Sequence, residues 1–487
     1  MLFNKNKKLS WSFIVILSGF FLSVLLSSYY INKYDHYKSD GYHHQLIKDE
    51  TYYHWKLGDE IAEETRKGKN FFLSGDVTYT KPLHQRIVAL YSLITGYDLV
   101  ESNGNDPIPK VNLGGKLPFL ILQSFIYFCS LFYFSKSLIK VVPEKSFFYI
   151  ILFLSIELTI FQYHSSFWTE SIFFSLQLII FGKLLEKKKN LFHNFVIGIL
   201  VGLAFLQRSG AIFYIIPILI CYSFLFKKKI IKPSFGIITG YSLIAILIGV
   251  YNFHKTNTFY IYPSEGKYAI HTYFCTDIIA KKFNISTEEA RLYEVKKTVQ
   301  WAKKNNLKFN SQFDIDKIKS TLELRNFFLN ETEKNKYFDY LNQRQFEILL
   351  NNPIIASKKI IEKTFHLIVL NPTFNYFYNE YRGKQEGKVS FVYTETHKKL
   401  IPYRIIYSLV IYIFSFLGFI YLLKRKKYYE LSLISISILY YIGLFGWYGK
   451  TRLYVPALIY LSVFFGIGLE MFINNFKKKK FFFKSIL

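Results

Sequence analysis

The sequence predicts an all-α polytopic membrane protein, because ten long apolar stretches alternate with short connections rich in lysine. Each stretch is close to the ~20 residues that a helix needs to cross about 30 Å of hydrocarbon. The aromatic content of 20% also suits a membrane protein with Tyr and Trp at both interfaces. The predicted transmembrane helices are 10–31, 115–142, 147–164, 167–186, 192–208, 211–226, 231–253, 403–423, 428–447 and 452–475.

Basic residues gather at every second connection, which sets the expected orientation. With the N-terminus in the cytoplasm, all of these clusters face the cytoplasm, as the positive-inside rule requires. Both termini are therefore expected inside, and the first stretch reads as an uncleaved signal-anchor. Most of the net charge of +28 then lies in these connections and interacts with anionic lipid head groups. The charge therefore does not indicate a nucleic-acid partner. The clusters lie in 5–8, 136–145, 183–189, 227–232, 424–427 and 477–484.

Two polar segments, 32–114 and 254–402, are too long to be turns, and the same alternation places both outside. They divide the chain into a transmembrane module with the first outer loop (1–253), an outward-facing helical segment (254–402) and C-terminal transmembrane helices with a basic tail (403–487). Loops on a rigid scaffold often carry function, so chemistry or binding is expected at this face. Within the second segment, periodicity predicts helices at 286–305, 315–331, 333–351 and 353–370.

Two amphipathic helices are expected in the first outer loop, both lying flat on the membrane surface. The first starts after Asp49, and the second starts at Pro82 and stops at Gly96. Their apolar stripes are Tyr53, Leu57 and Ile61 in the first, and Leu83, Ile87, Leu90, Tyr91 and Ile94 in the second.

Three acids at or near the outer side are candidates for chemistry. Asp49 can act as a general base if a substrate hydroxyl comes within hydrogen-bond reach, or it can simply cap the helix that follows. Glu170 lies at the outer mouth of the bundle, where a helix N-terminus also favours an acid. Glu157 lies deeper, where a carboxylate marks either a functional site or an interhelical hydrogen bond. The nearby histidines match no standard metal-ligand spacing.

Three outward cations run against the positive-inside rule. Arg208 ends the fifth predicted span, Arg452 opens the last, and Lys81 lies in the first outer loop. A guanidinium binds phosphate bidentately and stays charged, so these positions suit an anionic headgroup. The alternative is that they reach toward ordinary phospholipid at the interface.

Five short elements stand at the ends of predicted helices on the outer side. The first is Asp49-Glu50-Thr51-Tyr52-Tyr53, and the second is Lys81-Pro82-Leu83, which begins the helix ending at Gly96. The third is Thr169-Glu170. The fourth is the run from Gly202-Leu203 to Arg208, and the fifth is Arg452-Leu453-Tyr454-Val455-Pro456.

In this order the elements resemble those of the GT-C membrane glycosyltransferases, in the branch of the protein O-mannosyltransferases and the lipid A aminoarabinose transferase. That family carries Asp-Glu-x-x-Tyr, Lys-Pro-Pro-Leu, Thr-Glu, Gly-Leu-x-x-Leu-x-Arg and Arg-Tyr-x-x-Pro. The second element here lacks one proline, and the fifth matches imperfectly. The resemblance covers residues 1 to about 253 and 403–475. In 254–402 it is limited to an Asn-Pro helix at 352–370.

The resemblance implies an inverting transfer of a sugar from a polyprenyl-phosphate donor to a glycan, lipid or protein acceptor at the outer face. Asp49 would take the acceptor's proton. Lys81, Arg208 and Arg452 would hold the departing phosphate. Glu170 would orient sugar or acceptor, or hold a divalent cation if one were needed, although no cofactor is expected. The remaining implied substrate-binding residues are Glu50, Tyr53, His84 and Tyr454.

The implied location is a bacterial inner (plasma) membrane with the site facing the periplasm. A flippase or transporter of a lipid-linked glycan is the main alternative. A transporter places its polar sites near the bilayer midplane, often on broken helices in two related halves. The third possibility is an inactive assembly partner. The sequence keeps its charges at the outer rim and shows no related halves, which favours the transferase.

Overall fold

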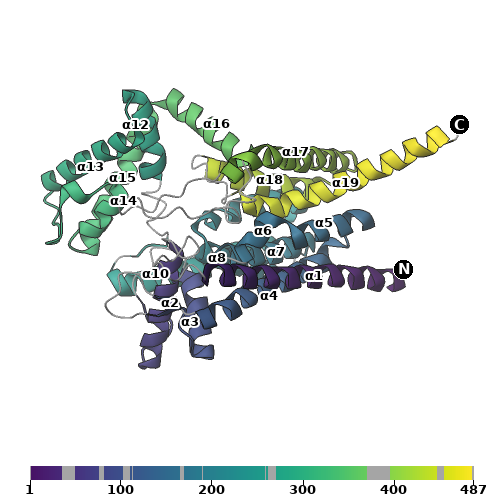
Figure 1. Cartoon of the computed structure of the whole chain (residues 1–487), viewed down its shortest axis with the longest axis horizontal. Helices are drawn as coiled ribbons and strands as arrows, with labels where there is room; N and C mark the ends of the chain where they lie inside the picture. Colours follow the sequence, from purple (N-terminus) through teal and green to yellow (C-terminus); the bar gives the residue numbers. More distant parts are fainter. Residues whose placement is uncertain are drawn as a thin grey trace.

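The chain folds as a long helical bundle with polar helical units at one end (Figure 1). The computed structural model describes residues 2–35, 50–75, 82–101, 110–111, 113–164, 169–188, 190–257, 259–261, 270–369, 395–446 and 454–484, some of them for the backbone alone. The helices of the bundle are α1 (Leu2–Asp35), α4 (Leu113–Leu138), α5 (Glu144–Ile156), α6 (Leu158–His164), α7 (Glu170–Leu185), α8 (Leu191–Gln207), α9 (Ile215–Phe226), α10 (Ile231–Thr256), α17 (Glu395–Lys424), α18 (Tyr428–Gly446) and α19 (Val455–Lys484).

The two polar segments form the remaining elements. They are α2 (Glu50–Arg66), α3 (Pro82–Thr95), α12 (Thr276–Phe283), α13 (Thr287–Lys304), α14 (Thr321–Leu324), α15 (Glu331–Asn351) and α16 (Pro353–Val369). A two-residue antiparallel ribbon joins β1 (Val100–Glu101) to β2 (Lys110–Val111), with Val100 opposite Val111.

The predicted fold class, an all-α polytopic membrane protein, is confirmed. Within the described ranges, six helices are long and apolar enough to cross a membrane, and two shorter apolar helices accompany them. The predicted span 147–164 is divided into α5 and α6 at Glu157, and the span 167–186 becomes the 16-residue α7. The six long spans are Ser10–Tyr29, Lys116–Leu138, Ser209–Lys229, Ile231–Thr256, Pro402–Lys424 and Val455–Phe476, and the shorter two are Leu191–Gln207 and Tyr428–Leu444.

The two ends of the bundle differ in chemistry. The chain termini lie together at one end, whereas α2, α3 and α12–α15 lie at the other (Figure 1). The basic connections that follow α4, α7, α9 and α17 are at the end that holds the termini, and there Lys187 pairs with Glu430 at 2.6 Å. We call this the lysine end and the opposite one the loop end. The predicted alternation of basic and polar connections therefore appears as two separate ends of one bundle.

Two helix pairs approach so closely that only glycine fits between them. A Cβ at Gly198 of α8 would overlap the carbonyl oxygen of Ile237 in α10, and one at Gly240 of α10 would overlap that of Phe195. Gly418 and Gly468 allow the same contact between α17 and α19. Lipid gives little hydrophobic drive for helix association, so small residues that permit backbone contact hold such pairs together.

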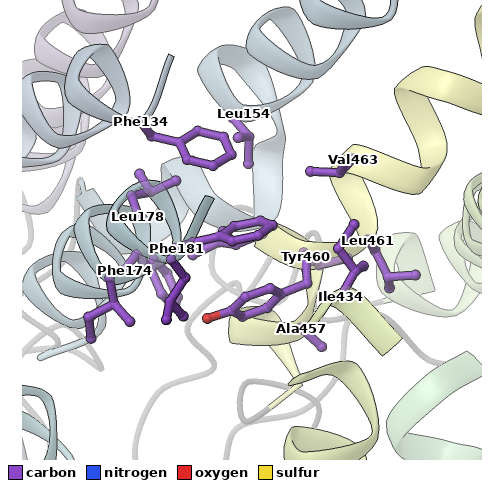
Figure 2. Packing of buried hydrophobic residues seen from close by; sticks show 14 of the residues in the cluster. Phe134, Leu154, Phe174, Leu178, Phe181, Ile434, Ala457, Tyr460, Leu461 and Val463 are labelled. Atoms are coloured by element: carbon purple, nitrogen blue, oxygen red, sulfur yellow. The ribbon is translucent and has the colours of Figure 1, made fainter. Parts of the chain in front are cut away.

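Aromatic side chains fill the space between α4, α7 and α19 (Figure 2). The ring of Phe181 stacks on Phe134 with centroids 5.1 Å apart and lies 4.7 Å from the ring of Tyr460. The Tyr460 hydroxyl donates to Gln177 Oε1 at 2.8 Å and also contacts the Tyr214 hydroxyl. This buried network joins the N-terminal module to the C-terminal helices across more than 240 residues of sequence.

The segment 254–402, which the sequence predicts to face outward, contains a helical unit with its own core, formed mainly by α12, α13 and α15. The predicted helices at 286–305, 333–351 and 353–370 are confirmed as α13, α15 and α16. The predicted helix at 315–331 is wrong. That stretch forms short helical turns around α14, because Phe328 bridges back to Phe309, and their rings stack 5.0 Å apart.

A fully buried carboxylate lies at the centre of this unit. Glu294 on α13 accepts two hydrogen bonds from Arg344 on α15, at 2.8 and 3.1 Å, and its Oε2 lies 3.1 Å from Nε2 of His271. Burial acts to raise the pKa of Glu294, but the hydrogen bonds from His271 and Arg344 outweigh it and hold this pKa at about 2. The carboxylate therefore stays ionised and ties α13 to α15 and to the π-helical turn His271–Cys275.

Candidate functional site

An ion pair between Arg208 and Glu170 joins α8 to α7 at the loop end. Arg208 follows the last residue of α8, where the backbone becomes extended, and its N–H still donates to Ala204 at 2.9 Å. Glu170 begins α7, and its side chain is 1% exposed. The guanidinium lies 5.9 Å from the centre of the Phe173 ring. Two buried charges in this contact neutralise each other, and removal of either would leave an uncompensated charge.

Gln207 links the segments that carry this pair. Its amide nitrogen donates to the backbone oxygen of Thr169 at 2.8 Å and lies 3.2 Å from Nδ1 of His84. The Thr169 carbonyl can only accept, so the amide group facing it must be the NH₂, and His84 Nδ1 accepts the second hydrogen. Neutral His84 therefore carries its proton on Nε2. One amide thus connects α8, the start of α7 and α3.

His84 enters this cluster because the buried face of α3 carries polar side chains beside the apolar Val88 and Ala89. His84, Gln85 and Ser92 are buried, whereas Leu90 and Ile94 of the predicted apolar stripe are 51% and 75% exposed. The ring of His84 packs edge-on against Phe119 of α4, with centroids 6.3 Å apart. The expectation of a helix at this place is confirmed, and Gly96 ends it with φ of 74°. Of the apolar stripe, Leu90 and Ile94 face outward, whereas Tyr91 is buried with its ring 5.2 Å from that of Phe119.

The polar segment that precedes α3 is anchored to α2 and α3 up to residue 75. The guanidinium of Arg86 donates to the backbone oxygens of Phe71, Phe72 and Ser74 at 2.7 to 3.1 Å. Burial lowers the pKa of Arg86. A carboxylate oxygen of Glu64 accepts from the backbone N–H of Gly75 at 2.9 Å, and this bond, helped by Lys69, lowers the pKa of Glu64. These contacts fix the chain up to residue 75, six residues before Lys81.

Glu157 caps a helix inside the bundle. The chain is extended at this residue, between α5 and α6, and the carboxylate accepts from the backbone N–H of Ile160 at 2.9 Å and from the Thr159 hydroxyl at 2.7 Å. The Tyr407 hydroxyl of α17 donates a third bond at 3.1 Å. Of the two expectations for Glu157, this geometry supports the interhelical hydrogen bond. The carboxylate stabilises both the break and the contact with α17.

The structure thus brings three of the predicted site residues together: Glu170, Arg208 and His84. Tyr454 is fully buried at the start of α19, close to Tyr412 and to Glu157 rather than to the Arg208 pair. Glu50 and Tyr53 lie on the first turn of α2, where the backbone alone is described. Asp49, Lys81 and Arg452 lie outside the described residues, so their roles stay predictions.

Three buried polar residues near the loop end were missed by the sequence analysis. They are Gln207, Lys116 at the start of α4 and Arg404 in the first turns of α17, with exposed fractions of 0%, 3% and 4%. The signal that singled out Arg208, a cation at the outer end of a predicted span, applies equally to Lys116 and Arg404. For Gln207 no such signal exists in the sequence.

Groups able to hold a metal ion were also sought among the described residues. No cluster of three or more His, Cys, Asp or Glu side chains occurs in that part of the chain. The His-rich stretch before Asp49 lies outside it. The absence of a metal cofactor therefore stays a prediction from the sequence.

No protein-family model matches this chain, and no curated protein sequence matches it. Solved structures of the oligosaccharyltransferase of Archaeoglobus fulgidus resemble it. The apo form has a TM-score of 0.49 and 12% identity over 97% of this chain. The form in complex with an inhibitory peptide and a dolichol-phosphate has a TM-score of 0.43 and 10% identity over 96%. The form tethered with an acceptor peptide has a TM-score of 0.42 and 9% identity over 94%.

These neighbours are themselves GT-C glycosyltransferases, the class that the sequence elements resemble. This chain spans about half of their length: 52%, 52% and 50%, in the order given above. Identity near one residue in ten with TM-scores below 0.5 carries no argument about activity.

Proposed function

We propose that this chain is an inverting membrane glycosyltransferase that moves a sugar from a polyprenyl-phosphate donor to an acceptor hydroxyl at the loop end. One observation supports this more than any other. Three separate sequence elements, ending in Glu170, in Arg208 and in the helix of His84, meet in one buried cluster through Gln207. The resemblance to the GT-C enzymes implies that these same three elements contribute to one site.

In the proposed reaction, the acceptor hydroxyl attacks the anomeric carbon on the face opposite the phosphate. The new carbon–oxygen bond forms as the bond from that carbon to the phosphate oxygen breaks, and its electron pair leaves with the polyprenyl phosphate. Asp49 takes the hydroxyl proton. Arg208, with Lys81 and Arg452, stabilises the charge that grows on the leaving phosphate. The anomeric configuration is inverted, as in single-displacement sugar chemistry.

The ion pair gives Glu170 a specific place in this scheme. The carboxylate neutralises Arg208 when no phosphate is bound, and the entering phosphate takes over as the partner of the guanidinium. Glu170 is then free to orient a hydroxyl of the sugar or of the acceptor. This exchange of one anion for another avoids an unpaired buried charge at either stage.

One feature favours the transporter alternative: the helix α5–α6 is broken inside the bundle at a buried carboxylate. Broken helices near the midplane are typical of secondary transporters. Here, however, Glu157 is satisfied by three donors and closes the break, which leaves it little capacity to bind a substrate. Arg208, the described one of the three cations that suit a phosphate, is at the loop end instead.

The two functions are separated by an assay without a membrane barrier. Purified protein in detergent is mixed with a polyprenyl-phosphate hexose and candidate glycan, lipid and peptide acceptors, and released polyprenyl phosphate is measured. A transferase releases it and a transporter does not. Arg208→Gln should abolish release, whereas Lys228→Gln, an exposed lysine at the lysine end, should leave it unchanged. Vectorial movement in liposomes without release would support the transporter.

We further propose a bacterial inner membrane as the location, with the loop end facing the periplasm and both termini in the cytoplasm. The partners are then the lipid-linked sugar donor, the surrounding lipid, and an acceptor on a glycan, a lipid or a protein. We propose that turnover needs no metal ion, which added chelator tests directly.

A further inference from the structure

We propose that the free side-chain oxygen of Gln207 binds a hydroxyl group of the donor sugar. This inference rests on the proposed function and adds to it a residue that contacts the sugar. Gln207 is the last residue of α8 and directly precedes Arg208, the proposed partner of the donor phosphate. The side chains of both residues reach the start of α7, where Gln207 contacts Thr169 and Arg208 contacts Glu170.

The hydrogen bonds of Gln207 leave one atom unused. Both hydrogens of its amide group are committed, one to Thr169 O and the other to His84 Nδ1. Among the described residues, no group donates a hydrogen bond to its Oε1, although the side chain is 0% exposed. A buried carbonyl without a donor is unfavourable, and such groups in native proteins call for an explanation.

The two hydrogen bonds that hold the amide of Gln207 also determine which kind of ligand group its oxygen can bind. Thr169 O can only accept, so the amide cannot rotate by half a turn without placing two acceptors against each other. The Gln207 oxygen therefore stays an acceptor, and none of the described residues donates to it. A neutral hydroxyl satisfies it, and a phosphate oxygen does not.

Gln207 has no exposed surface, so entry of the sugar must move a neighbouring group. The exchange of Glu170 for phosphate at Arg208 provides that movement, since Glu170 directly follows Thr169. The sugar hydroxyl then donates to Gln207 Oε1 in a site without water. A sugar that lacks this hydroxyl would leave the buried oxygen without a donor, so discrimination between sugars is strong.

The test compares binding of sugars that differ by one hydroxyl. Short-chain polyprenyl phosphates bearing glucose, galactose or mannose are titrated into the detergent-purified protein, and monodeoxy analogues of the tightest binder follow. We expect one analogue to bind wild type about 5- to 100-fold more weakly than its parent. In Gln207→Met the same two ligands should bind equally, because the missing hydroxyl has no partner. Sugar-free polyprenyl phosphate should bind both proteins alike.

Two further variants keep this test decisive. Gln177→Met replaces another fully buried glutamine, which contacts Tyr460 in the middle of the bundle, and should retain the discrimination. Gln207→Glu, when protonated, can still donate to Thr169 and keeps a free oxygen, so it should retain the discrimination if Met at this position fails to fold.

The outcomes separate this inference from the proposed function. If Gln207→Met weakens parent and analogue by the same factor, Gln207 only positions its neighbours and the inference is overturned. The same conclusion follows if wild type does not discriminate among the analogues. If wild type binds none of the lipid phosphates, with or without sugar, the proposed function itself fails.

Discussion

The hydroxyl of Tyr407 on α17 donates to the carboxylate of Glu157, 250 residues earlier in the chain, across 3.1 Å. This bond joins the break between α5 and α6 to the C-terminal helices. We expect Tyr407→Phe to cost about 1.5–3 kcal/mol, as for hydrogen bonds to charged groups. Glu157→Ala should cost more, because the cap of α6 is also lost. Thermal unfolding in detergent measures both.

Turnover of the protein that remains folded should be near normal in both variants, since this cluster is separate from the Arg208 pair. Full stability combined with lost activity or transport would instead identify Glu157 as a functional carboxylate.

Because Arg208 and Glu170 form a buried ion pair, removing both charges should restore the stability that is lost when Arg208 alone is changed, but it should not restore activity. Arg208→Gln leaves Glu170 buried without its partner and should destabilise the protein by about 3–5 kcal/mol. Adding Glu170→Gln should recover most of that loss, because neither charge remains. Release of polyprenyl phosphate should stay abolished in the double variant. Recovered turnover in the double variant would rule out Arg208 as the phosphate-binding residue.

Asp49→Asn tests the proposed general base. The change keeps the shape and a helix-capping oxygen but removes the charge and the basicity. We expect turnover to fall by about 10²–10⁴ while donor binding survives. If Asp49 is only the cap of α2, turnover stays near normal and stability changes by at most ~1 kcal/mol. Asp40→Asn is the matched control, and loss of turnover in that variant alone would transfer the role to Asp40.

The helical unit of α12, α13 and α15 should lose stability in acid through Glu294. Its pKa is lowered from 4.5 to about 2 in the folded state, so its contribution is fully present above about pH 4.5 and is lost as the pH falls toward 2. Limited proteolysis of the unit between pH 5 and 2.5 measures this loss. Glu294→Gln should be less stable at neutral pH and should respond less to acid over that interval. An unchanged acid response in this variant would assign the effect to other groups.

Orientation is tested by labelling single cysteines with a membrane-impermeant maleimide on intact cells. Lys67→Cys on the first outer loop and Lys304→Cys at the end of α13 should react, because both positions are exposed at the loop end. Lys228→Cys at the lysine end should react only after permeabilisation. Cys129, which is exposed, is first replaced by serine. The reverse labelling pattern would invert the topology.

The sequence was sufficient to predict the structural features that depend only on how residue types are distributed along the chain. Apolar length and lysine placement predicted the bundle and its two chemically different ends, and Pro82 and Gly96 predicted the limits of α3. These signals are local, or they follow from the alternation of successive helices, so no knowledge of packing is needed.

Features that depend on which side chains meet could not be read from the sequence. The apolar stripe of α3 predicted a helix lying on the membrane surface, and it did not indicate that α3 also buries His84 against Gln207 on α8. The break at Glu157 carries no glycine or proline signal, and its cap is completed by Tyr407 from a distant helix. The helix predicted at 315–331 has suitable periodicity, but the contact of Phe328 with Phe309 overrides it.

The glycine contact between α8 and α10 has a mechanical consequence for the site. Helices whose backbones touch cannot slide or tilt relative to each other without collision, so α8 and α10 form one stiff beam. Arg208 is attached to the end of that beam and stays in register with it. We therefore expect the ion pair to open through the side chains of Arg208 and Glu170 or through the start of α7, and not through a movement of α8 against α10.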